Sequence, residues 1–430
     1  MVDEDTFDAS LALVESEWNA SSSAKLLEIL PWILADSPRR LRIKNLLEKK
    51  HSIILAENPN ELYEWLWSQP SADRGEMARF RVELYDFLSD RMANSSSLAD
   101  YFRDDPPASI RLDEIRWGGV TRDGIPPIRQ PRMRDAGHAD FLADTDKVFG
   151  VRIGGESRAY PRRILGFHEM VSDVIAGNPV TGVYCPLCET MIVYKNRTAN
   201  GTVHSFGTSG FLYRSNKLMY DAVTLSLWST IDGEPVVGRL VHERIELERL
   251  PVVTTTWGEW RASNPDTQVL TLEGLPLNPQ GRPLSEKYIE DEAYWQYLSS
   301  DRLMFPVSHR DTTLKNKDEV FVPRVAKPTR PIAISTAFLQ NKPLFHVSEP
   351  GIDLVVLTTP VGANRAYDGT GLQLTVLVSP TSVRDAKGRT WVVSEETLRC
   401  ETGEIRNRIP GHRAFWFAWH AAHPDSRLIR

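Results

Sequence analysis

Two cysteines separated by two residues are the feature of this sequence best suited to chemistry, within Val183-Tyr-Cys-Pro-Leu-Cys-Glu-Thr-Met-Ile-Val-Tyr194. The spacing of Cys185 and Cys188 lets two thiolates reach one metal ion at Zn–S distances of about 2.3 Å. It also suits a redox dithiol, in which a helix amino terminus lowers the pKa of the first thiol. The residues after Cys188 favour a strand. The pattern therefore indicates a knuckle-like turn between strands and argues against a thioredoxin-type site.

A metal site needs donors beyond two thiolates, because zinc prefers four ligands and copper(I) takes soft donors. The first candidate is His168. In a helix predicted over residues 164–176, Ile164, His168 and Val171 share one face, which turns the imidazole inward, toward the strand that leads into Cys185. A core histidine with a hydrogen-bond partner explains the same pattern, and both interpretations stay open.

Met219 is the second additional donor that the sequence offers. Its thioether would favour copper(I) over zinc, although methionine commonly fills apolar cores. Cys400 lies far along the chain from the thiol pair, and we interpret it as a buried structural thiol. The predicted metal ligands are therefore Cys185, Cys188, His168 and Met219. No catalytic residue and no organic cofactor are predicted.

Residues 204–221 form a further candidate segment, rich in glycine and hydroxyl side chains. Gly207 and Gly210 permit positive φ, and the Ser and Thr groups between them could bind an anion. A β-turn closed by hydroxyl groups is the favoured interpretation. Arg214 and Asp221 could form an ion pair beside the site or at the surface.

The elements that must position these residues change along the chain. Residues 1–103 show the apolar spacing of helices and predict a helical N-terminal domain. Residues 104–140 place Pro and Gly among many charges, which is typical of an irregular linker. From residue 141 short β-branched runs alternate with turns, which predicts β-rich modules over 141–300 and 301–430. The expected fold class is α+β.

An internal repeat relates the two β-rich modules. Asp146-Lys-Val-Phe149 returns in outline as Asp318-Glu-Val-Phe321, and Trp257-Gly-Glu-Trp260 returns as Trp416-Phe-Ala-Trp419. A unit that returns in the same order is typical of one supersecondary module packed against its copy. We therefore expect two diverged copies of one module.

The second copy lacks the soft donors of the first. Aligned by eye, Cys185 falls near Thr358 and Cys188 near Val361. We therefore expect the chemistry to reside in the first module and the second module to act as a degenerate scaffold.

Composition excludes several classes of function. The 430 residues include 51 basic and 57 acidic side chains, for a formal charge of −6, so no overall positive field attracts nucleic acid or an acidic membrane. No run is apolar enough to span a bilayer, and the opening Met-Val-Asp-Glu-Asp does not read as a secretory signal. A cytoplasmic location is expected. Three cysteines do not make a disulfide framework, so thiols or metal ligands are expected there.

A string of motifs in fixed order resembles the prokaryotic family catalogued as domain of unknown function 3179, over about residues 140–430. The resemblance implies that His168, Cys185, Cys188 and Met219 belong together, but it implies no reaction. The motifs that carry it are Arg158-Ala-Tyr-Pro161, Phe167-His-Glu-Met-Val171, Tyr184-Cys-Pro-Leu-Cys188, Phe206-Gly-Thr-Ser-Gly210, Leu212-Tyr-Arg-Ser-Asn216, Met219-Tyr-Asp221 and Ser226-Leu-Trp-Ser229.

The first hypothesis for function is a metal-binding protein that holds copper or zinc at the Cys-x-x-Cys/His site. An open coordination position would make the metal redox-active or catalytic, and an enzyme of this kind would be a metal-dependent oxidoreductase. The alternative is a non-enzymatic scaffold or interaction protein, with a structural thiol pair and a helical N-terminal domain that binds a protein partner. A third reading makes Cys185 a nucleophile with His168 as its base.

Overall fold

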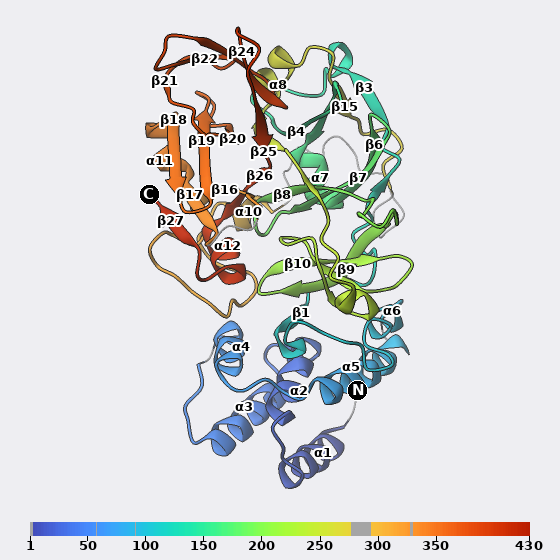
Figure 1. Ribbon diagram of the computed structural model, residues 1–430. Coiled ribbons are helices and arrows are strands. Elements are labelled where there is room, and N and C mark those ends of the chain that lie inside the picture. Colours follow the sequence, from blue (N-terminus) through green and yellow to red (C-terminus); the bar gives the residue numbers. More distant parts are fainter. Residues whose placement is uncertain (1–2, 57, 91, 277–293, 327–329) are drawn as a thin grey trace.

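The computed structural model describes residues 3–56, 58–90, 92–276, 294–326 and 330–430 (Figure 1). A helical region comes first and is followed by a β-rich part that contains several sheets. This order of elements confirms the predicted α+β class at the level of secondary structure.

The helical region is held by capped helices around a buried ion pair. The Asp73 carboxylate accepts the N–H of Glu76 at the start of one helix, which satisfies a donor that the helix leaves free. In the core, Arg81 pairs with Glu28 at 2.9 Å, and the Tyr85 hydroxyl donates to the same carboxylate at 2.9 Å. The helices are α1 (Glu4–Ser16), α2 (Ser22–Ile29), α3 (Pro38–His51), α4 (Pro59–Ser68), α5 (Arg74–Phe87) and α6 (Ser96–Ala99), with 3-10 turns η1 (Leu30–Trp32) and η2 (Leu88–Asp90).

The helical region packs directly on a sheet of the β-rich part (Figure 1). One apolar cluster contains Leu27 and Tyr85 from the helices together with Phe211, Leu227 and Val237 from the strands. Burial of apolar surface on both sides joins the two parts. The sheet has the order β1-β9-β10-β11-β12 and consists of β1 (Ile115–Trp117), β9 (Phe206–Tyr213), β10 (Asn216–Asp221), β11 (Leu227–Ser229) and β12 (Pro235–Val237).

Residues 104–140 are more ordered than the predicted irregular linker. Strand β1 pairs with β9. Strand β2 (Ile128–Arg129) pairs with β6 (Met170–Ile175), and β3 (Met133–Asp135) pairs with β15 (Gln268–Leu270). Short 3-10 turns, η3 (Leu112–Glu114) and η4 (Ala136–His138), separate them. The prolines and glycines end each strand after two or three residues, but distant partners supply the backbone hydrogen bonds. Residues 104–140 therefore join the sheets at three places, and the predicted linker and domain boundaries stay a prediction.

The first half of the β-rich part contains two further sheets, with orders β13-β8-β7-β6-β2 and β14-β4-β5-β15-β3. Their strands are β4 (Lys147–Ile153), β5 (Glu156–Pro161), β6 (Met170–Ile175), β7 (Asn178–Cys185), β8 (Thr190–Lys195), β13 (Arg249–Leu250), β14 (Val253–Thr256) and β15 (Gln268–Leu270). The helical elements are α7 (Arg162–His168), η5 (Arg239–Glu243) and α8 (Trp257–Ser263).

The second half contains sheets of order β26-β16-β17-β27 and β18-β19-β20-β25-β24-β23-β22-β21. Helix α10 (Trp295–Leu298) precedes it, and α11 (Thr336–Asn341) and α12 (Trp416–Ala422) lie within it. Its strands are β16 (Glu319–Pro323), β17 (Ile332–Ser335), β18 (Leu344–Glu349), β19 (Ile352–Thr358), β20 (Asn364–Asp368), β21 (Leu374–Ser379), β22 (Ser382–Asp385), β23 (Thr390–Val393), β24 (Thr397–Cys400), β25 (Ile405–Ile409), β26 (Gly411–Phe415) and β27 (Arg427–Ile429).

The strand order of the first half recurs in the second half. In β14-β4-β5-β15 and in β26-β16-β17-β27 the first two pairings are antiparallel and the last is parallel. The series β13-β8-β7-β6 and β25-β20-β19-β18 also match, as do β9 to β12 and β21 to β24. The origin of both halves from one module stays a prediction.

The helix predicted over residues 164–176 is correct only at its start. Helix α7 ends at His168, Glu169 adopts a left-handed conformation with φ 57°, and strand β6 begins at Met170. Strand β6 pairs along its whole length with β7, from Met170 against Val183 to Ile175 against Asn178. Pairing with a distant strand overrides the local helical spacing, as β-branched residues allow.

Close packing of β4 against α8 leads to a prediction for Gly150. A Cβ at this position would lie 2.2 Å from the Trp260 ring. We expect Gly150→Ala to lower the free energy of unfolding by about 1–3 kcal/mol, because the ring must leave its rotamer. Gly137→Ala, where nothing lies within 4 Å of the added Cβ, is the matched control. Equal urea midpoints for the two variants would contradict the packing described.

Candidate functional site

Cys185 and Cys188 lie on one tight turn between two strands. Cys185 is the last residue of β7, the N–H of Cys188 donates to the Cys185 carbonyl at 3.0 Å, and β8 begins at Thr190. The Thr190 hydroxyl donates to the Cys188 carbonyl at 3.0 Å and stiffens the turn. The predicted turn between strands is therefore present, and the residues that follow Cys188 in the chain form a strand instead of a helix.

Both thiols are enclosed by apolar side chains from distant parts of the chain. Cys185 is 5% exposed and Cys188 is fully buried. The Cys188 thiol donates to the Ser215 carbonyl at 3.3 Å, and the Cys188 carbonyl accepts the N–H of Phe415 from the second half at 2.8 Å. The surrounding cluster consists of Leu187, Leu212, Val307, Phe415, Phe417, Ala418 and Ala421, with Tyr294, Tyr297, Leu298, Leu303 and Phe305 at its edge.

The environment of Cys188 favours the neutral thiol. Burial is the largest cause that raises its pKa well above the usual value, and the neighbouring thiol of Cys185 and the charge of Glu169 act in the same direction. A backbone hydrogen bond at Lys217 opposes the shift only in part. Without a cation at the sulfur, Cys188 therefore keeps its proton at neutral pH.

A buried ion pair lies beside the thiols, between Lys217 and Glu169. The two charged groups are 2.5 Å apart, and their side chains are 6% and 10% exposed. The Tyr294 hydroxyl donates to the other oxygen of Glu169 at 3.5 Å, and the Tyr297 hydroxyl donates to the Leu187 carbonyl at 2.9 Å within the thiol turn. The pair thus places a cation and an anion in an otherwise apolar surrounding.

Sequence reasoning missed four of these side chains. Glu169, Lys217, Tyr294 and Tyr297 were given no role. Glu169 does lie within the motif Phe167-His-Glu-Met-Val171, which was a usable signal. The two tyrosines lie more than 100 residues beyond the thiols, so no local spacing could have indicated them.

His168 is buried and fixed by one ring nitrogen. Its Nδ1 lies 2.8 Å from the Pro126 carbonyl, which can only accept, so Nδ1 carries the proton. Burial lowers the pKa of His168, which keeps the ring neutral. The other nitrogen, Nε2, has no hydrogen-bond partner among the described residues. The predicted inward orientation is present, and the ring presents one free acceptor atom.

Met219 and Cys400 lie in other surroundings. Met219 belongs to an apolar cluster with Met170, Phe206 and Trp228, separate from the cluster around the thiols. Cys400 is buried with Trp391 and accepts the Thr402 hydroxyl at 3.2 Å. Within the described ranges, no three His, Cys, Asp or Glu side chains form a group that could hold a metal ion. Shared metal binding by the four predicted ligands therefore stays a prediction.

The segment 204–221 forms strands instead of the expected turn. It contains β9 and β10, and of its two central glycines only Gly210 has a positive φ, at 87°. The suggested pair of Arg214 with Asp221 was wrong. Arg214 donates to Glu114 at 2.6 Å, whereas Asp221 lies 2.7 Å from Nδ1 of a buried histidine, His204.

The family expected from the motifs is also found by comparison with protein-family models. The model described as protein of unknown function (DUF3179) matches residues 122–426, so the chain belongs to this family. No curated protein and no solved structure matches the chain significantly. Across the part of the chain that the structure describes, no helix has both the length and the apolar character needed to cross a bilayer.

Removal of Lys217 tests the buried ion pair. Lys217→Met leaves the Glu169 carboxylate buried without its cation, and we expect a loss of about 3–5 kcal/mol in the free energy of unfolding. Lys195→Met is the matched control, because Lys195 pairs with Glu248 at 2.6 Å where the two side chains are 30% and 60% exposed, and it should cost about 1 kcal/mol or less. Denaturant titration measures both; similar losses would refute the special position of Lys217.

The raised pKa of Cys188 predicts a pH dependence of stability. The folded protein retains the thiol proton, whereas the unfolded chain releases it above the usual value of 9.0. The contribution is therefore present below pH 9 and is lost as pH rises above it, by up to about 1.4 kcal/mol per pH unit. Comparing the free energies of unfolding of wild type and Cys188→Ala across this range isolates the effect. Parallel curves for the two proteins would show that the thiol titrates normally.

Proposed function

We propose that this protein binds copper(I) through Cys185 and Cys188. The observation that carries the proposal is the matching turn in the second half, between β19 and β20. In that turn the Thr359 N–H donates to the Ala363 carbonyl at 3.0 Å, and the Gly362 N–H donates to the Thr359 carbonyl at 2.8 Å. The turn contains no cysteine. The thiols are therefore not required for the turn, which leaves them available for chemistry.

The donor set favours copper(I) over zinc. A structural zinc site has four protein ligands, and soft thiolates select copper(I). The thiol turn supplies two sulfur donors in an apolar enclosure that excludes competing water. Metal binding would replace the Cys188 proton, which burial otherwise holds, and the Lys217 ammonium offsets part of the negative charge that results. When bound, the ion would supply a soft Lewis-acid or one-electron centre.

His168 is the candidate third ligand. A metal-binding imidazole usually donates its second nitrogen to a carbonyl or carboxylate, which fixes the ring and leaves the other nitrogen for the metal. His168 has this arrangement, with Nδ1 on the Pro126 carbonyl and Nε2 without a partner among the described residues. Met219 is the weakest of the proposed ligands. It packs against Phe206 and Trp228 in a separate cluster, and this packing by itself accounts for its burial.

We also propose that the two halves are diverged copies of one module, with the metal site in the first. The support is the recurring strand order and a matched pair of residues at the same register. Arg249 lies opposite Tyr194 between β13 and β8, and Arg408 lies opposite Tyr367 between β25 and β20. The Tyr194 hydroxyl donates to a backbone carbonyl between β11 and β12, and the Tyr367 hydroxyl donates to one between the matching strands β23 and β24.

Copper(I) competition tests the metal proposal. Protein kept reduced and free of oxygen is titrated against bicinchoninate, a chromophoric copper(I) chelator. We expect wild type to remove about one equivalent of copper(I) from the chelator. Cys185→Ser/Cys188→Ser should leave the copper with the chelator under the same conditions. Cys400→Ser, which removes a buried thiol in another cluster, is the matched control and should behave as wild type.

Two outcomes would overturn the proposal. Equal copper withdrawal by wild type and the double variant would place the metal elsewhere. Lack of withdrawal by wild type, together with a lowered free energy of unfolding for the double variant, would favour the alternative of a structural thiol pair in a scaffold protein. His168→Gln in the same assay shows whether the imidazole adds a third bond.

A further inference from the structure

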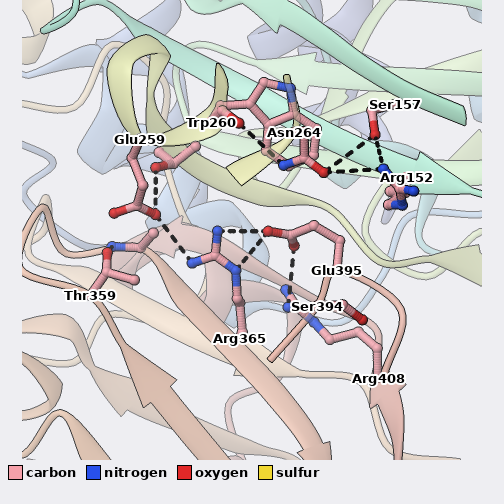
Figure 2. A network of polar contacts seen from close by, with 12 residues as sticks. Arg152, Ser157, Glu259, Trp260, Asn264, Thr359, Arg365, Ser394, Glu395 and Arg408 are labelled. Carbon is pink, nitrogen blue, oxygen red and sulfur yellow. Dashed lines mark hydrogen bonds and ion pairs between the residues drawn. The ribbon is translucent and has the colours of Figure 1, made fainter. Parts of the chain in front are cut away.

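The two halves exchange charged side chains at two matching places, here called the closed junction and the open junction. At the closed junction, Glu396 of the second half lies 3.5 Å from Arg152 of the first half. The neighbouring Glu395 pairs with Arg365 and Arg408 of its own half (Figure 2). At the open junction, Asp232 of the first half contacts Arg324 and His423 of the second half. Glu396 follows β23 and Asp232 follows β11, so in each case an acid after the matching strand contacts an arginine of the other half.

The closed junction satisfies its charges internally. Arg365 donates to Glu395 at 2.8 Å and to Glu259 at 3.2 Å, and Arg408 lies 3.5 Å from Glu395. Figure 2 shows the Arg365 guanidinium between the two carboxylates. The side chains of Arg365 and Glu395 are only 5% and 10% exposed. The arginines and carboxylates of this junction are therefore paired with one another.

The open junction lacks the central pair. Arg365 stands two residues before Tyr367, and Ile192 stands two residues before the matching Tyr194. By the same count from Trp260 and Trp419, Glu259 is matched by an alanine, Ala418. Both replacements are buried and apolar. Ile192 packs in the cluster of Trp228 and Ala418 in the cluster around the thiols, so the pair of Arg365 and Glu259 has no charged counterpart in the other half.

A cavity of ≈ 1180 Å³ lies at the open junction, between the two halves. This volume is ample for a small organic ligand, since ligand pockets typically measure roughly 300–1000 Å³. The indole of Trp419 lines it and lies against the His423 ring, with centroids 4.2 Å apart and an angle of 33° between the ring planes. The apolar part of the wall includes Pro179, Leu247, Pro323, Val325, Ile409 and Pro410.

The cavity is lined by the guanidinium groups of Arg249 and Arg324 and by acidic side chains, of which Asp232 lies nearest to both arginines. Asp232 accepts from Arg324 at 3.2 Å and lies 3.1 Å from the His423 ring. Arg249 donates to the Asp232 carbonyl and pairs at the edge with Glu246, whose side chain is 57% exposed. Burial is the largest cause that lowers the pKa of Arg324; the charge of Arg249 acts in the same direction, and Asp232 opposes the shift. A second anion beside the two guanidinium groups would offset their mutual repulsion.

We propose that this cavity binds a small organic carboxylate, held by the guanidinium groups of Arg249 and Arg324 with its apolar body against the prolines and Trp419. Arginine presents a planar fork of donors that matches a carboxylate. Of the three glutamates that line the cavity, Glu246 pairs with Arg249, Glu248 pairs with Lys195, and Glu234 is exposed. The site is separate from the thiol turn, so it does not depend on the proposed metal.

Ligand-observed NMR and calorimetric titration of the full chain test the site with benzoate, phenylacetate and hexanoate as probes. We expect millimolar or tighter binding of at least one, and no binding of phenylethylamine, which has a similar body and the opposite charge. Arg324→Gln should abolish binding. Arg152→Gln is the matched control, because it removes the equivalent arginine of the closed junction, 3.5 Å from Glu396, and should bind as wild type.

A second variant keeps the test decisive if Arg324→Gln does not fold. Ala199→Trp places a large ring in the cavity from an exposed loop and should also abolish binding. Failure of all three carboxylates, equal binding of phenylethylamine, or binding of inorganic phosphate alone would each overturn the proposal. Cys185→Ser/Cys188→Ser should bind the carboxylate as wild type, which separates this result from the copper experiment.

Discussion

Each half of the β-rich part completes hydrogen bonds and ion pairs of the other, and the rest of the structure depends on this exchange. The Cys188 carbonyl in the first half accepts the N–H of Phe415 from the second half. Asp232 of the first half pairs with Arg324 of the second half, and at the closed junction Arg152 of the first half pairs with Glu396 of the second half. A buried polar group without a partner is costly, so the loop ends of one half are stable only against the other.

Burial of charge gives the thiol turn its chemical character. An isolated charge in an apolar enclosure is strongly disfavoured, so Lys217 and Glu169 occur there as a pair. Burial raises the pKa of Cys188 in this enclosure, and burial also lowers the pKa of His168, so both groups are neutral. The copper site that we propose would favour a soft ion over small, strongly hydrated cations.

The two junctions show how small changes alter a common framework. The tyrosine, arginine and tryptophan positions are retained at both, but an arginine and a glutamate at the closed junction correspond to Ile192 and Ala418 at the open one. A cavity lies beside Asp232 and Arg324, whereas Arg365, Glu259 and Glu395 pair with one another at the closed junction. The thiol turn follows the same principle, since its counterpart in the second half retains the backbone turn without the sulfurs. Framework and chemistry thus vary independently.

Local spacing in the sequence determined the helical region, the strands on either side of Cys185 and Cys188, the burial of His168 and the family motifs. These depend on periodicity and turn chemistry within a few residues. Only the tertiary structure decided that α7 ends at His168, that residues 104–140 join the sheets, and that Glu169, Lys217, Tyr294 and Tyr297 surround the thiols. Those features come from strand pairing and packing between segments far apart in the chain, which residue spacing does not record.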